Sequence, residues 1–215
     1  MKPSFYEEHP DRAFRLGDVL TGFVLCNVSM ASPLGRDTRH YKYDINVVRP
    51  EYVVVLTPCC SIGDRMLTVS PLADINPTFL KNGYLGEDLT RVNREMMPEQ
   101  AVPQDIWHKL PEKERQKRLQ IGKGYAFVEQ FVYEPHGLLP EYQLDTPKGK
   151  IRSSFYMIDF RRAYRVECDK VIGANDVPIA AKLLQVSVAV REELRRKLAK
   201  YFSRRPKEDE VQLGL

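Results

Sequence analysis

Long apolar runs are missing from this chain, and so are the short motifs that mark the common enzyme classes. No segment approaches the roughly 18 continuous apolar residues that a membrane-spanning helix needs, and residues 1–14 lack the apolar core of a signal peptide. The sequence also has no glycine-rich phosphate loop, no His-Glu-x-x-His and no Gly-x-Ser-x-Gly. We therefore expect a protein of the cytoplasm, with no cofactor.

Cysteine is scarce, with four residues at Cys26, Cys59, Cys60 and Cys168. Without a secretion signal, these predict reduced thiols. Cys59 and Cys60 are adjacent and would point to opposite sides of an extended chain, and no Cys-x-x-Cys pair exists to complete a zinc site. A catalytic thiol would need a histidine base, and the histidines fall in loops or insertions. Packing of one cysteine in the core and the other at a turn is favoured, and we expect no metal.

Apolar and β-branched segments predict a mainly β fold. Strands are expected within residues 16–30, 52–56, 66–70, 124–133 and 154–166. Residues 74–123 carry fewer apolar side chains, more charge and several prolines, so we interpret them as an insertion. Prolines near their starts predict short helices at 104–110 and 111–119 within it. The sequence thus indicates one domain over residues 1–205, followed by a flexible tail at 206–215.

A helix is predicted near the C-terminus, over about residues 177–203. Apolar residues recur there every three or four positions from Ile179 to Phe202, and Asp176 is a suitable N-cap. The opposite face of this helix is strongly basic, with Arg191, Arg195, Arg196, Lys197, Lys200, Arg204 and Arg205. The formal net charge of the chain is only +4, so a solvated helical face is favoured over a phosphate-binding surface.

Two polar residues invite a functional interpretation. Asp159 lies inside an apolar segment and needs a partner, which Arg161, Arg162 or Arg165 could supply. A structural ion pair is favoured over catalysis. His136 lies in a turn bracketed by prolines and could hold a general base, although a plain loop residue is favoured.

Two segments carry a family resemblance. They are the run Arg15-Leu16-Gly17-Asp18-Val19 and the stretch from Arg49-Pro50 to Val69-Ser70-Pro71-Leu72. Together they resemble the MazF/PemK superfamily, whose sequences open with R-G-D-[IV] and continue with R-P-x-V-V-[IV] and V-x-P-[IL]-T. The resemblance covers about residues 14–73. It implies an SH3-like β-barrel with a terminal helix, often dimeric, in a family whose toxins cut single-stranded RNA.

The chain departs from the family pattern at three places. Leu16 interrupts the first motif, and Glu51 and Tyr52 separate the Arg-Pro pair from the valine run. Ala73 stands where the catalytic threonine of the family would fall. Alanine has no hydroxyl to hold a phosphate oxygen, so the family's activity should fall by orders of magnitude.

The run Thr57-Pro58-Cys59-Cys60 is similar to a divergent branch of these barrels, found among bacterial and phage-defence genes. Some members of that branch bind partners beside CRISPR-linked proteases. The leading expectation is therefore a catalytically degenerate MazF-like domain. It would bind a protein partner in a prokaryotic defence system, either CRISPR-linked or of the toxin–antitoxin type.

Two alternatives stay open. The first is a sequence-specific single-stranded RNA endoribonuclease with altered chemistry, and the second is a nucleic-acid-binding module without chemistry. The nuclease would use Arg49 or Arg65 on the phosphate and a hydroxyl or thiol near the turn. The candidate ligand- or partner-binding residues are Arg15, Arg49, Thr57, Cys60, Arg65 and Ser70. No residue is assigned a catalytic role, and a homodimer stays open.

Overall fold

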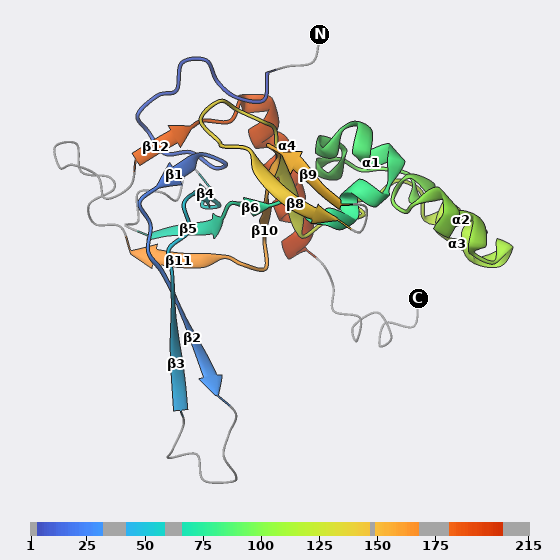
Figure 1. The fold of residues 1–215 in the computed structure, drawn as a ribbon, viewed down its shortest axis with the longest axis horizontal. Helices are drawn as coiled ribbons and strands as arrows, with labels where there is room; N and C mark the ends of the chain where they lie inside the picture. The colour runs from blue at the N-terminus through green and yellow to red at the C-terminus, as the bar shows by residue number, and fades with distance from the viewer. Residues whose placement is uncertain (1–3, 32–41, 59–65, 147–148, 168–180, 204–215) are drawn as a thin grey trace. The chain divides into compact units, whose positions relative to one another are not determined.

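The computed structural model describes residues 4–31, 42–58, 66–146, 149–167 and 181–203. The chain divides into two compact units. Unit 1 comprises residues 1–5, 73–161 and 187–215, and unit 2 comprises residues 6–72 and 162–186. Every helix of the described residues belongs to unit 1 (Figure 1). None of these helices combines the length and apolar character that crossing a membrane requires.

An antiparallel sheet with strand order β11-β5-β4-β1-β12 forms the centre of unit 2. Its strands are β1 (Val19–Thr21), β4 (Val53–Val55), β5 (Met66–Pro71), β11 (Tyr164–Glu167) and β12 (Ala181–Leu184). The three valines of β4 are fully buried, which explains the unbroken apolar run in the sequence. Val53 and Val55 pack in a core with Leu20, Leu67 and Val69.

A two-stranded hairpin continues from this sheet. Strands β2 (Leu25–Ala31) and β3 (Lys42–Val48) pair from Leu25↔Val48 to Ala31↔Lys42. Leu25, at the base, is fully buried in the core of unit 2. The rest of the hairpin extends away from the five-stranded sheet (Figure 1).

Unit 1 contains two smaller sheets. One has the order β6-β10-β7, and the other is the hairpin β8-β9. The strands are β6 (Ala73–Asp74), β7 (Gln130–Tyr133), β8 (Tyr142–Thr146), β9 (Gly149–Ser153) and β10 (Tyr156–Asp159). The Tyr142 hydroxyl accepts a hydrogen bond from the Ile75 N–H at 2.9 Å and donates one to the Phe155 carbonyl. That phenol therefore joins the β8-β9 hairpin to the residue after β6 and to the residue before β10.

Short helices supply much of the core of unit 1. They are η2 (Pro77–Lys81), α1 (Gly83–Glu87), η3 (Leu89–Asn93), η4 (Pro98–Gln100), α2 (Gln104–Lys109) and α3 (Glu112–Ile121). Asn76, Asn82 and Asp88 each cap one of the first three by accepting a backbone N–H. The helices predicted at 104–110 and 111–119 are confirmed. Phe79 and Val92 pack with strand residues in one core cluster.

The C-terminal helix is α4 (Val188–Phe202), so the predicted helix is confirmed over most of its length but begins later than expected. Residues 181–184 are strand β12 instead, because they pair with β1. Ser187 then caps the helix, its Oγ accepting the Val190 N–H at 3.4 Å. The predicted cap, Asp176, lies outside the described residues.

Two predicted strands need correction. Only residues 130–133 of the segment 124–133 form a strand. The segment 154–166 is two strands, β10 and β11, which pair in different sheets. The break follows Asp159, whose carboxylate accepts the Arg161 N–H at 3.0 Å in a local turn.

The mainly β character and the C-terminal helix are confirmed, while none of the sheets that the described residues form closes into a barrel.

A side chain, Asn93, forms the hydrogen bonds that a neighbouring strand would otherwise make with β7. The Val132 N–H donates to Asn93 Oδ1 at 2.7 Å, and Asn93 Nδ2 donates to the Val132 carbonyl at 2.8 Å. The amide thus satisfies both backbone groups of Val132 in place of a further strand. Asn93 is 1% exposed, so water cannot substitute for it.

Replacing this amide should destabilise unit 1. We expect Asn93→Ala to cost about 2–4 kcal/mol, because it leaves a buried N–H and a buried carbonyl unsatisfied. The free energy of unfolding, measured with urea, checks this. The exposed Asn46→Ala variant is the control and should change stability by less than about 0.5 kcal/mol. A similar small change for Asn93→Ala would contradict the prediction.

Candidate functional site

The turn before β1 contains the first of the two motifs that resemble MazF. Gly17 has φ of 89°, a conformation that favours glycine, and its N–H donates to the Val55 carbonyl at 2.8 Å. Asp18 is fully buried, and its Oδ2 accepts the Arg15 N–H at 2.9 Å. This motif therefore shapes the entry into the central sheet.

Lys182 of β12 neutralises that buried carboxylate. Its Nζ lies 2.7 Å from Asp18 Oδ2 and donates to the Ala13 carbonyl and to Gln185 Oε1, each at 2.7 Å. The lysine side chain is only 9% exposed. A buried carboxylate needs such a partner. Sequence reasoning missed Lys182, because no spacing rule links it to a turn at the other end of the chain.

Arg15 is held by a neighbouring carboxylate. Its Nε lies 2.8 Å from Asp11 Oδ2, and this hydrogen bond is the main cause that lowers the pKa of Asp11. Lys182 adds to the same effect from 3.5 Å. The Arg15 guanidinium is therefore part of an ion-pair network with Asp11, Asp18 and Lys182.

The two predicted hydroxyl residues are buried in unit 2, Ser70 on β5 and Thr57 just past the end of β4. Thr57 Oγ1 accepts the Thr68 N–H at 2.6 Å, which continues the pairing of β4 with β5 past the end of β4. Ser70 is fully buried on β5, opposite Val54. The structure places both residues in unit 2, but it does not present either side chain at an accessible surface.

Only one of the remaining predicted residues, Arg49, lies within the described part of the chain. Arg49 is exposed just after β3, while Cys60 and Arg65 lie outside the described residues, as does Cys59. Ala73 lies on β6, opposite Met157.

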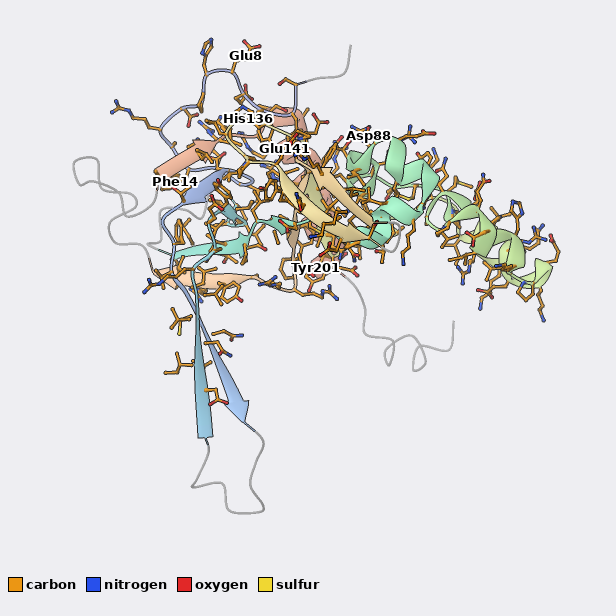
Figure 2. All side chains as sticks on the ribbon, viewed as in Figure 1. Glu8, Phe14, Asp88, His136, Glu141 and Tyr201 are labelled. Carbon is orange, nitrogen blue, oxygen red and sulfur yellow. The ribbon has the colours of Figure 1, made fainter. Side chains whose placement is uncertain are left out.

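Asp159 and His136, the two polar residues singled out by the sequence, each bond to a residue two positions further along the chain. The predicted ion pair of Asp159 is confirmed with Arg161, whose Nε lies 2.9 Å from Asp159 Oδ1. His136 lies in the loop after β7, where its Nδ1 accepts the Leu138 N–H at 3.1 Å (Figure 2). Within the described ranges, no group of three or more histidine, cysteine or acidic residues could hold a metal ion.

The basic face predicted for α4 is partly wrong. Arg195, Arg196 and Lys200 are exposed, but Arg191 is only 7% exposed and Lys197 is fully buried. Lys197 Nζ donates to the Val92 carbonyl and lies 5.6 Å from the centre of the Tyr125 ring. Its long side chain therefore holds η3 against α4 instead of facing solvent.

Burial changes the acidity of this lysine. It lowers the pKa of Lys197 from 10.5 to about 7, against the opposing influence of Glu129 and Glu193. The ammonium exchanges hydration for one carbonyl and an aromatic face, which explains the direction of the shift.

The hairpin β2-β3 carries a surface of a different kind. Opposed residues in an antiparallel pair share a face, so the pairs Cys26↔Val47 and Val28↔Ile45 lie on one side of the ribbon. Val28, Ile45 and Val47 are 59%, 66% and 58% exposed, and Cys26 is exposed as well. We call these four residues the apolar face.

The opposite side of the ribbon is polar. Asn27 and Asn46 are paired there and exposed, and Asp44 follows two positions away. The base of that same side is formed by Leu25, which is buried in the core of unit 2. Strand alternation therefore points the apolar face away from the core of its own unit. Sequence reasoning missed this surface, because none of its predicted strands covers β3, residues 42–48.

A shallow depression over the β8-β9 hairpin is the other feature of interest. It is lined by Glu141, Tyr142, Gln143 and Arg152. Arg152 lies 4.0 Å from the Glu141 carboxylate, and the Tyr142 hydroxyl already bonds to backbone groups. Three of its four lining side chains, Glu141, Tyr142 and Arg152, have partners within the unit, so it is a weaker candidate than the apolar face.

Comparisons with protein-family models, with curated proteins and with solved structures find no match for this chain.

The buried ion pair of unit 2 should be essential for its stability. Lys182→Met leaves the Asp18 carboxylate buried without its cation, so we expect a loss of about 3–5 kcal/mol. The double variant Asp18→Asn/Lys182→Met removes the charge as well and should recover part of that loss. Urea unfolding measures both.

Arg161→Met is the control for this cycle. It breaks an ion pair in which the arginine side chain is 60% exposed, so it should cost less than about 1 kcal/mol. Equal losses in the single and double variants would show that the charge of Asp18 does not matter.

Lys197 predicts a specific dependence of stability on pH. Because its pKa is lowered to about 7 in the folded chain and is 10.5 otherwise, the unfolded chain binds one more proton between those values. The free energy of unfolding should therefore rise with pH in this window, by up to about 1.4 kcal/mol per pH unit. Below about pH 7 the cost of burying the lysine is present in full.

Urea unfolding at pH 7, 8 and 9 tests this for the wild type, Lys197→Met and Lys200→Met. Lys197→Met should lose the rise with pH. Lys200→Met, an exposed change on the same helix, should keep it. Identical pH dependence in all three proteins would contradict the prediction.

Proposed function

We propose that this protein is a non-catalytic binding module that contacts a protein partner through the apolar face of the β2-β3 hairpin. The observation that carries the proposal is the exposure of Val28, Ile45 and Val47 on one side of a ribbon whose other side is polar. Clustered apolar side chains at a surface are typical of protein-binding sites.

The non-catalytic part of the proposal is supported by what the candidate residues do. The Arg15 guanidinium binds Asp11, and Thr57 and Ser70 are buried within unit 2. Ala73 has no hydroxyl to take the place of the threonine in the MazF pattern. A phosphoryl-transfer site needs accessible groups that converge on the phosphate.

A protein is a better partner for this surface than a nucleic acid. Binding to a phosphate backbone depends on clustered lysine and arginine. The four residues of the apolar face carry no charge. Apolar contact would therefore supply the affinity.

The two sequence motifs that resemble the MazF/PemK superfamily suggest the setting in which the protein works. We infer a divergent MazF-like domain in a prokaryotic defence system, CRISPR-linked or of the toxin–antitoxin type. Unit 2 contains both motifs, and its five-stranded antiparallel sheet is compatible with an open relative of the SH3-like barrel.

Site-specific photo-cross-linking tests this function. A benzophenone amino acid replaces Val28 on the apolar face, and in a matched control it replaces Asn27 on the polar side. In cells that naturally contain the protein, irradiation should give a protease-sensitive, RNase-resistant adduct from position 28 and far less from position 27. An RNase-sensitive adduct from position 28 would favour the nucleic-acid alternative instead.

A cleavage assay with purified protein addresses the catalytic alternative. Single-stranded RNA should stay intact with the wild type. Cleavage that Arg49→Ala abolishes would make the protein an endoribonuclease and overturn the non-catalytic half of the proposal.

A further inference from the structure

We propose that helix α4 is a proton-controlled switch in unit 1, which opens locally when its buried Lys197 takes up a proton. In the closed state the helix packs against η3. In the open state it leaves η3, while the sheet β6-β10-β7 stays folded. The switch lies wholly in unit 1 and is separate from the binding surface proposed on unit 2.

One side of α4 packs into unit 1. Val190, Leu194 and Leu198 are buried at a spacing of four residues, which is typical of the core side of a helix. Lys197 follows Val190 by two helical turns, so it lies on this same side, and it is fully buried. A lysine therefore occupies a position where the helical pattern favours an apolar residue.

The buried amine has fewer acceptors than an ammonium needs. A charged lysine carries three N–H donors. Within the described part of the chain, Lys197 Nζ has one hydrogen-bond acceptor, the Val92 carbonyl of η3, and the Tyr125 ring at 5.6 Å. The charged form thus loses hydration that the protein only partly replaces, whereas the neutral amine loses far less. Closure of α4 therefore favours the neutral lysine.

Charged groups around this contact do not reverse that preference. They come from η3 and the residues after it, from α4, and from the segment before β7: Arg91, Arg94, Glu95, Glu129, Glu193 and Arg196. Arg91 binds Glu87, and Arg94 Nε lies 3.2 Å from Glu193 Oε1. Glu129 and Glu193 attract the charge of Lys197 without a hydrogen bond, but burial prevails and lowers the pKa of Lys197 to about 7.

The aromatic neighbour does not titrate in the same range. Burial raises the pKa of Tyr125, so its phenol stays neutral where Lys197 titrates. Lys197 is therefore the group whose charge changes on closing.

Helix α4 can leave η3 without disturbing the sheets. No strand pairing of the described residues includes α4, and its backbone hydrogen bonds lie within the helix. On the other side of η3, Asn93 still bonds to Val132 of β7. Opening breaks the contacts of Lys197 and Arg94 and exposes the apolar side of α4, but it breaks no ladder of the sheet. Elements held in this way open as separate units.

The direction of the pH effect follows from the two states of the lysine. In the open state Lys197 returns to water, where its pKa is 10.5, while in the closed state it is about 7. Between these values the open state binds one more proton, so each pH unit of acidification multiplies the open-to-closed ratio by about ten. Below about pH 7 both states bind the proton, and the ratio stops changing.

Hydrogen exchange of the full-length chain, followed by mass spectrometry of its peptides at pH 7, 8 and 9, tests the switch. After correction for the intrinsic exchange rate, protection of α4 should rise about tenfold per pH unit. Peptides of β7 report unfolding of the whole unit and should be more protected than α4 at every pH. That difference separates local opening of the helix from global unfolding.

Two variants at position 197 remove the titrating group. Lys197→Met is neutral and similar in length, so protection of α4 should no longer rise with pH. Lys197→Gln keeps a neutral N–H donor for the Val92 carbonyl and should behave in the same way, which covers the case that the methionine variant fails to fold. Lys200→Met, an exposed change on the same helix, is the matched control and should keep the rise.

Three results would overturn the switch. They are equal protection of α4 and β7 at every pH, protection of α4 that stays constant from pH 7 to 9 in the wild type, and a rise that persists in both variants at position 197. None of these bears on the binding surface of unit 2, which cross-linking from position 28 tests separately.

Discussion

The buried ion pair between Asp18 and Lys182 is the contact on which the arrangement of unit 2 depends. A carboxylate that is fully buried cannot stay charged without a cation beside it, and Lys182 supplies one from β12. This keeps β12 against β1, with β4 on the other side of β1. The core valines and leucines, and the base of the β2-β3 hairpin, are built onto that frame.

Polar side chains in both units form hydrogen bonds with backbone groups that a neighbouring strand or water would otherwise satisfy. Asn93 pairs with Val132 as a strand would, and Lys197 donates to the Val92 carbonyl from within the core of unit 1. In unit 2, Thr57 extends the ladder between β4 and β5. Residues whose types suggest chemistry are thus engaged in holding the fold, and this favours a function that lies on the surface instead.

The alternation of side chains along the hairpin links the fold to the proposed function. Leu25 must point into the core, and the alternation of a strand then sends Cys26 and Val28 to the other side. The apolar face is a direct result of an anchored base and an apolar residue at every second position. A hairpin that only extended from unit 2 would not need apolar side chains on one side, whereas a hairpin that binds a partner would.

The sequence by itself determined the local features: the buried valine strand at 53–55, the short helices of residues 104–121 and an ion pair between Asp159 and a nearby arginine. Each depends on neighbours in the chain. Only the tertiary structure decided that 181–184 is a strand, that Lys197 is buried and that Val28 shares a face with Ile45. Those outcomes depend on pairing and burial between distant segments, which local propensity and periodicity do not encode.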